Sequence, residues 1–213
     1  MRFPFLFLLS FLGLQVFGQA SGYLAKIPKY NEASQFEDEK YKNMTWQEFE
    51  KLDAVKEFVD PDNYDYDLLS AAVFFANNKY RFNKDVAPLK FEPRLRDAAA
   101  IHTYEMVRRK FFDHINSADA RIKMPNNRTE LAGFVGERIA ENLERDFIDI
   151  QKPITYMELA DKAIRDLSRS RDHNEHMLDP NLTLLGCAIM FEPAPNSDGY
   201  WFFRLTQDFG KSW

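Results

Sequence analysis

The chain has 213 residues, 45% of them hydrophobic and 15% aromatic, which is enough apolar material for one substantial core. Its 28 basic and 33 acidic residues give a formal net charge of −5, which argues against nucleic acid as a partner. The single cysteine, Cys187, excludes an internal disulfide. Because it lies in the apolar run 184–191, we predict a small buried side chain rather than a reactive thiol.

Residues 1–20 have the pattern of a secretory signal peptide. Arg2 supplies a positive charge, an apolar run follows, and Gly18-Gln19-Ala20 resembles a cleavage site. A membrane anchor is the alternative, but the apolar stretch is short for a bilayer core of about 30 Å. We therefore predict export to the periplasm, the cell envelope or the medium. No later stretch is apolar enough to be a transmembrane segment after signal removal.

Residues 21–64 form an acidic amino-terminal arm that contains one predicted helix. Thr45 and Glu48 have the spacing of a capping box. Apolar residues then recur at roughly helical spacing as far as Val59, before Asp60 and Pro61 break the pattern. We expect this helix to pack on a main domain that spans residues 65–213.

Three longer helices are predicted in the main domain. The first runs from Tyr66 through Arg81, and the second begins with Pro93 in its first turn and ends in a basic segment at 108–110. The third is opened by a second capping box, made by Thr155 and Glu158. A loop with a short helix near 119–123 lies between the second and third helices.

Strands are predicted in three places. Residues 138–143 alternate apolar and polar side chains, which directs Glu141 toward the interior. The apolar runs 184–191 and 200–205 are joined by turn residues at 195–199 and indicate a hairpin. Strands that are apolar on both faces need helices on each side. The predicted fold is therefore α+β, a three-layer α-β-α sandwich with a small antiparallel sheet.

Three residues are the main candidates for chemistry: His114, Glu141 and His173. Imidazole and carboxylate groups bind zinc or another divalent metal, or exchange protons near neutral pH. The spacing of these residues has little specificity by itself. The sequence has no Walker loop and no G-x-G-x-x-G motif, so we expect no nucleotide cofactor, and it has neither H-E-x-x-H nor G-x-S-x-G.

Several nearby residues are weaker candidates. His176 lies one helical turn after His173, and we expect one of the two to be structural. Glu137 competes with Glu141 as the inward carboxylate, and Asp113 is either a partner of a ligand residue or a helix-end residue. His102 lies on an apolar helix face and is expected in the core, as are Phe111 and Phe112.

The order of several short segments resembles the CAP superfamily, which includes cysteine-rich secretory proteins, venom antigens and plant pathogenesis-related proteins. The likeness is closest to its disulfide-free bacterial branch and covers roughly residues 66–210. It rests chiefly on Asn78-Lys79-Tyr80-Arg81, Pro88-Leu89-Lys90-Phe91, Phe111-Phe112-Asp113-His114, Ala140-Glu141-Asn142-Leu143, Asp172-His173, Met177-Leu178, Gly186 and Thr206-Gln207-Asp208-Phe209-Gly210.

This resemblance implies an α-β-α sandwich with a central cleft lined by two histidines and acidic residues. The matching positions are His114, Glu141 and His173. For the second acid the sequence offers Glu158, Asp161 and Asp166 as weak candidates. The approach to His173 departs from the family pattern, because Leu167 replaces a common tryptophan and Arg171-Asp172 replaces small residues.

Fold does not determine activity, so three functional hypotheses remain open. The first is an exported binding module whose cleft holds a metal ion, a small ligand, a lipid or a peptide. The second is a metal-assisted hydrolase that acts on envelope or extracellular polymers. The third is an interaction scaffold that uses the acidic amino-terminal arm as its contact. The sequence does not decide whether the protein is an enzyme, and it favours binding over catalysis.

Overall fold

The structure is a computed structural model that describes residues 20–28, 30, 32–34, 36–193 and 198–213. Residues 1–19 of the predicted signal peptide lie outside the described residues, as do positions 195–197 of the predicted hairpin turn. In the described part of the chain, no helix combines the length and the apolar character needed to cross a membrane.

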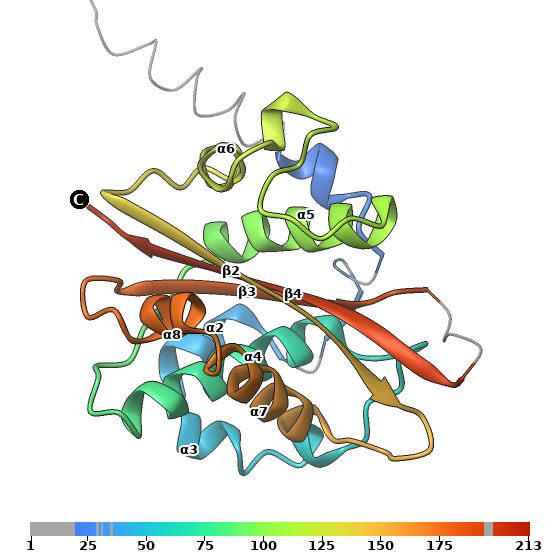
Figure 1. The fold of residues 1–213 in the computed structure, drawn as a ribbon. Coiled ribbons are helices and arrows are strands. Elements are labelled where there is room, and N and C mark those ends of the chain that lie inside the picture. Colours follow the sequence, from blue (N-terminus) through green and yellow to red (C-terminus); the bar gives the residue numbers. More distant parts are fainter. Residues whose placement is uncertain (1–19, 29, 31, 35, 194–197) are drawn as a thin grey trace, which may run out of the picture.

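One four-stranded sheet forms the centre of the molecule, in the order β1-β3-β4-β2 (Figure 1). Strand β4 pairs antiparallel with both neighbours, which confirms the predicted hairpin of the last two strands. The predicted strand at 138–143 also exists and continues to Asp149. The strands are β1 (Lys90–Phe91), β2 (Arg138–Asp149), β3 (Leu184–Phe191) and β4 (Tyr200–Lys211).

The sheet is mixed, whereas the sequence predicted an antiparallel one. The addition is β1, which pairs parallel with β3. Its main chain is held by Lys90 N–H donating to the Thr183 carbonyl at 2.9 Å and Glu92 N–H donating to the Leu185 carbonyl at 3.1 Å. A strand of two residues is too short to give a periodic pattern in the sequence, so only the pairing reveals it.

Helices cover both faces of the sheet, which confirms the three-layer sandwich (Figure 1). Two helices lie on one face: α5 (Pro93–Arg109) and α6 (Pro125–Leu131). The other face carries α2 (Asp38–Asn43), α3 (Trp46–Phe49), α4 (Tyr66–Phe82), α7 (Tyr156–Leu167) and α8 (Arg171–Leu178). The described residues also include two 3-10 turns, η1 (Ala54–Lys56) and η2 (Ala120–Ile122), and a helical turn at 20–24.

The three long helices start where their sequence signals indicate. The Asp65 side chain accepts from the Leu68 N–H at 3.0 Å at the start of α4, and Pro93 occupies the first turn of α5. The reciprocal capping box of Thr155 and Glu158 opens α7. Helix α5 stops at Lys110, which adopts a left-handed conformation with φ 56°.

Gly186 allows α5 to lie close against β3. A Cβ atom built at this position would lie 1.9 Å from the Arg96 backbone nitrogen and 2.3 Å from the Leu95 carbonyl carbon. No side chain fits there, so the contact between helix and strand requires glycine.

The next residue of β3 is Cys187, a free cysteine that is 2% exposed. Burial raises the pKa of its thiol.

The predicted helix between Thr45 and Val59 is wrong in its length. The capping box of Thr45 and Glu48 is present, but α3 ends at Phe49 and the chain turns into η1. On a continuous α-helix, Phe49 and Val55 would point about 120° apart. Both side chains are fully buried, and the break is what lets both enter the core.

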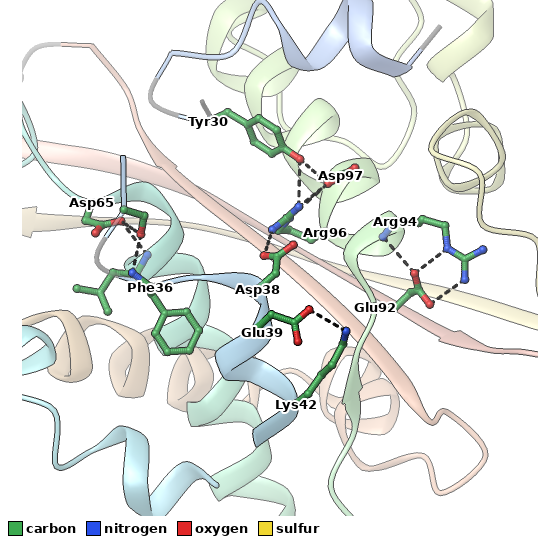
Figure 2. A network of polar contacts seen from close by, with 12 residues as sticks. Tyr30, Phe36, Asp38, Glu39, Lys42, Asp65, Glu92, Arg94, Arg96 and Asp97 are labelled. Atoms are coloured by element: carbon green, nitrogen blue, oxygen red, sulfur yellow. Dashed lines mark hydrogen bonds and ion pairs between the residues drawn. The ribbon is translucent and has the colours of Figure 1, made fainter. Parts of the chain in front are cut away.

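The amino-terminal arm is tied to the main domain by packing and by charge. Tyr41 and Phe49 belong to the same hydrophobic core as α4 and β3. Arg96 on α5 contacts Asp38 of the arm, and its guanidinium lies 5.6 Å from the centre of the Tyr30 ring (Figure 2). Tyr30 also donates a hydrogen bond to Asp97 (Figure 2). The arm is therefore packed as part of the domain.

Candidate functional site

Glu141 is the centre of a buried polar cluster at the edge of the sheet. Its Oε1 accepts from His114 Nδ1 at 2.7 Å, and its Oε2 accepts from Arg128 Nη2 at 2.6 Å. His114 lies in the loop after α5, Arg128 on α6 and Glu141 on the edge strand β2. The Glu141 and Arg128 side chains are almost fully buried, whereas the His114 side chain is 49% exposed.

The charges in this cluster stabilise one another. Burial by itself would raise the pKa of Glu141, but the hydrogen bond from His114 and the charge of Arg128 outweigh it and lower that pKa. In return, the hydrogen bond to Glu141 raises the pKa of His114 above its usual 6.5. Glu141 therefore remains a carboxylate with both oxygens engaged.

Arg128 on α6 holds the cluster together through several hydrogen bonds. The sequence analysis did not identify this residue. Its guanidinium also donates to the carbonyls of Ile122 at 3.0 Å, Lys123 at 3.1 Å and His114 at 3.1 Å. These bonds fix the loop that carries His114. The segment 116–137 was interpreted as a loop with one short helix, although Pro125 at the first turn of α6 is a helix-start signal that would have indicated a second.

His102 lies behind Glu141 on α5 and is fully buried. Its Nε2 donates to the Asp113 carbonyl at 3.0 Å and is 4.0 Å from Glu141 Oε1. Burial lowers the pKa of His102 to about 4, with the charge of Glu141 acting in the opposite direction. The imidazole is therefore neutral at physiological pH and serves to hold the loop after α5.

Asp208 on β4 is a second buried acid beside Glu141. The two residues are direct partners in the antiparallel register, so their side chains share one face of the sheet. Asp208 is 0% exposed, and burial together with the negative charge of Glu141 raises its pKa well above the usual value. We therefore assign Asp208 as a neutral carboxyl group. Sequence reasoning placed it in the family-like segment without giving it a role.

The neighbouring residue Asn142 points to the opposite face of β2. Its amide Nδ2 donates to the His173 carbonyl at 3.0 Å and to Gln207 Oε1 at 3.3 Å. The Asn142 oxygen is therefore left to accept from His176 Nδ1 at 2.9 Å. His173 and His176 both lie on α8 and both have a lowered pKa, chiefly because of burial.

A cavity of about 660 Å³ joins these two faces at the sheet edge. Its walls include His114 and Glu141 from one side and His176 from the other, with Ile139 and Ala140 of β2 between them. The remaining lining residues are Met124, Pro125, Asn126, Asn127 and Glu130. We call this cavity the histidine cleft. His173 does not line it, so the structure brings together His114, Glu141 and His176 there.

The other acidic candidates lie outside the histidine cleft. Glu137 pairs with Lys211 at 2.8 Å, and the Asp113 carboxylate accepts from the Ile115 N–H at 2.8 Å. Glu158 is used in the α7 capping box. Asp161 pairs with Lys79 at 3.1 Å and Asp166 with Lys162 at 3.3 Å.

The two aromatic residues before His114, Phe111 and Phe112, lie in different environments. The Phe111 carbonyl accepts from Arg204 Nη1 at 2.7 Å, and its ring contacts His102 with centroids 5.8 Å apart. Phe112 was expected in the core but is 45% exposed, with the Arg204 guanidinium 5.9 Å from its ring centre. Phe111 is therefore the residue of the pair that helps to position the loop.

The donor set of the cleft is sparse for a metal centre. Among the described residues, no group of three or more His, Cys, Asp or Glu side chains is placed to hold a metal ion. The cleft is lined by two imidazoles, His114 and His176, whose Nδ1 atoms are hydrogen-bonded to Glu141 and Asn142. That arrangement is the one in which partner groups set the tautomer of metal-binding histidines.

Comparison with known protein families decides the relationship of this chain. The family model for CAP, the cysteine-rich secretory protein family, matches residues 74–209, well over half of the chain. The chain belongs to the CAP family. The match contains every residue of the Glu141 cluster and both α8 histidines. No curated protein matches the sequence of this CAP protein.

Two solved bacterial structures share the CAP fold of this chain. The first is an extracellular protein with an SCP domain from Bacillus anthracis, 17% identical, with a TM-score of 0.54 over 72% of this chain and 44% of that one. The second is an outer surface protein from Borrelia burgdorferi, 12% identical, with a TM-score of 0.51 over 74% of this chain and 98% of that one. This CAP protein therefore spans less than half of the Bacillus protein.

Proposed function

We propose that this CAP protein is a binding module whose histidine cleft holds a divalent cation, zinc in the first instance, and a small ligand or peptide beside it. The supporting observation is the orientation of two imidazoles. His114 Nδ1 is bonded to Glu141 at 2.7 Å and His176 Nδ1 to Asn142 at 2.9 Å. In the neutral imidazole each Nδ1 therefore carries the proton and each Nε2 has the lone pair for a ligand. Because Glu141 raises the pKa of His114, a metal ion has to displace the Nε2 proton of the charged form there, so zinc binding should weaken as pH falls.

Two protein ligands leave positions open for water or for a bound molecule. The cleft of about 660 Å³ is of the size that small ligands occupy, and Asn126, Asn127 and Glu130 provide polar groups on its wall. Zinc would supply a fixed positive charge there. Fewer protein ligands also mean that we expect weaker metal affinity than in a site with three or four.

Binding is favoured over hydrolysis by the state of Glu141. A general base needs a free oxygen and a pKa near the working pH. Both Glu141 oxygens are engaged, and its pKa is lowered. The arm also fits a scaffold role less well, because Tyr41 and Phe49 are buried in the core instead of forming a contact surface.

Calorimetric titration with zinc alone tests the proposal. His114→Ala and His176→Ala should each abolish or greatly weaken binding, whereas His173→Ala, on the same helix as His176 but outside the cleft lining, should bind like the wild type. Unchanged zinc affinity in the first two variants would refute the site. Loss of binding in His114→Ala and His173→Ala, with His176→Ala binding like the wild type, would instead support the pair of histidines that the sequence singled out.

We also propose that the protein is exported. The supporting observations are the signal-like residues 1–20 and the descriptions of the two similar proteins as extracellular and as an outer surface protein. Expression with and without residues 1–20 tests this. The mature chain outside the cytoplasm should begin at Ser21, and the truncated chain should stay inside. Recovery of an uncleaved chain in the membrane would favour an anchor.

A further inference from the structure

A second cavity of about 660 Å³ lies at the opposite edge of the sheet, beside β1. One wall is the arm segment 41–47, and the others come from α4, from residues 88–91 and from Leu184. We call this cavity the β1-edge pocket. Its lining is chiefly aromatic and aliphatic and includes Trp46, Phe74, Phe82, Phe91 and Leu184.

The charges in the β1-edge pocket have one sign. Lys42 and Lys90 line it, and no Asp or Glu is among its lining residues. This is notable in a chain whose formal net charge is −5. Both lysines are exposed, and Lys42 is paired with Glu39 at 3.3 Å with both side chains more than half exposed. Such an ion pair exchanges readily for another anion, because its net stabilisation is small.

The uncharged polar groups of the lining are mostly committed elsewhere. The Asn78 side chain donates to the Leu89 carbonyl at 3.0 Å and accepts from the Leu89 N–H at 2.8 Å. Thr45 is used in the capping box of α3. Besides Gln47 and the Tyr41 hydroxyl, the groups left to recognise a ligand are an apolar interior and two cations.

We propose that the β1-edge pocket binds an amphipathic organic anion, a molecule with an apolar body and a single carboxylate head. The apolar body would fill the space between Trp46, Phe74 and Phe91, where removal from water stabilises the complex. The carboxylate would lie beside Lys90 and Lys42. The volume is within the range of pockets that enclose a small molecule.

Part of the aromatic wall is already open to solvent. Phe82 is 58% exposed at the end of α4, and the centre of its ring is 5.5 Å from that of Trp46. Exposed aromatic side chains beside an apolar cavity are typical of a binding site. The site is independent of the histidine cleft, because β1 and β2 are the two outer strands of the sheet. Its arm wall, residues 41–47, also precedes the family match at 74–209.

Titration of the intact protein with three probes of equal chain length tests the charge preference. The probes are dodecanoate, dodecyltrimethylammonium and dodecanol, each below its micelle concentration, and binding is followed by calorimetry and tryptophan fluorescence. Dodecanoate should bind most tightly and dodecyltrimethylammonium most weakly. Equal binding of the three probes, or tighter binding of the cation, would overturn the proposal.

Five variants locate the bound probe. Phe82→Asp and the double change Lys42→Glu with Lys90→Glu should each weaken dodecanoate binding about tenfold or more. The matched controls are Phe58→Asp, where the phenyl ring is 64% exposed, and Lys51→Glu, which lies on the arm outside the lining. Both controls should bind like the wild type, as should His114→Ala. Equal weakening in test and control variants would overturn the site.

Sedimentation with vesicles distinguishes a dissolved ligand from a lipid surface. We expect no binding to vesicles of phosphatidylcholine with phosphatidylglycerol under conditions where dodecanoate binds. Attachment to these vesicles with no binding of monomeric dodecanoate would overturn the proposal in favour of a membrane-docking surface. A failure of zinc binding at the histidine cleft would leave all of these results unchanged.

Discussion

The two outer edges of the sheet carry cavities of similar size but opposite character. At the β2 edge, a buried carboxylate is held between an arginine and a histidine and faces a polar cleft. At the β1 edge, aromatic rings from the arm, α4 and β1 surround an apolar pocket with a cationic rim. The difference follows from what covers each edge. Strand β2 is flanked by α6 and α8, which bring titratable side chains, whereas β1 is flanked by the aromatic arm.

The two edges are also stabilised by different forces. The β2 edge depends on charge pairs that are costly to leave incomplete. The β1 edge depends on ring packing, such as the stacked rings of Tyr41 and Phe91 with centroids 3.7 Å apart. Substitutions at the two edges should therefore differ in their dependence on pH as well as in size.

The largest effect is expected from Arg128→Met at the β2 edge. The change leaves Glu141 buried without its buried cationic partner and should lower the free energy of unfolding by about 3–5 kcal/mol. Urea denaturation measures this, with Arg121→Met as the control, because the Arg121 side chain is 66% exposed. If the two variants lost similar stability, the Glu141 cluster would not be the support of this edge.

Tyr41→Ala at the β1 edge should cost somewhat less, about 3 kcal/mol, because it removes a buried ring and leaves a cavity against Phe91 and Phe74. The loss should be the same at pH 5 and pH 7, in contrast to substitutions in the Glu141 cluster. Urea denaturation at both pH values checks it. A loss below 1 kcal/mol would mean that the arm contributes little to the folded domain.

His102 should make stability depend on pH. Its pKa is about 4 in the folded protein and near 6.5 in the unfolded chain, so the unfolded state takes up the proton first. The free energy of unfolding should therefore fall as pH drops from about 6.5 to about 4, by of order 3 kcal/mol from this residue. His102→Gln should remove most of that slope. An unchanged slope would assign it to His173 and His176, whose lowered pKa values act in the same direction from pH 6.5 downward, whereas the lowered pKa of Glu141 acts only below about pH 4.5.

The titration of His114 should have the smallest effect on stability, but it should be the clearest local report on the charge of Glu141. Because Glu141 raises its pKa, the contribution of His114 is complete below pH 6.5 and is lost as pH rises through the folded value. A chemical-shift titration of the four histidines should find His114 titrating above 6.5 and the other three below it. The assignment of the Glu141 hydrogen bond would fail if His176 titrated above His114.

Much of the architecture was accessible from local patterns in the sequence. The helical apolar pattern located α4, the capping box located α7, Pro93 located α5, and the period of two in β2 directed Glu141 inward. These signals involve only a few neighbouring residues, so they can be recognised without knowledge of the fold. The break after Phe49 could not be predicted in this way, because it results from the burial of two side chains, Phe49 and Val55, in one core.

The sequence by itself determined the layer order, the inward carboxylate and the set of histidines from which a site is built. Only the tertiary structure decided that Arg128 pairs with Glu141, that Asp208 lies opposite it, and that His176 rather than His173 lines the cleft. Periodicity fixes which face of an element a side chain occupies, whereas contacts between segments far apart in the chain depend on strand register and helix placement. For this reason the sequence could not tell which of His173 and His176, one turn apart on α8, lines the cleft.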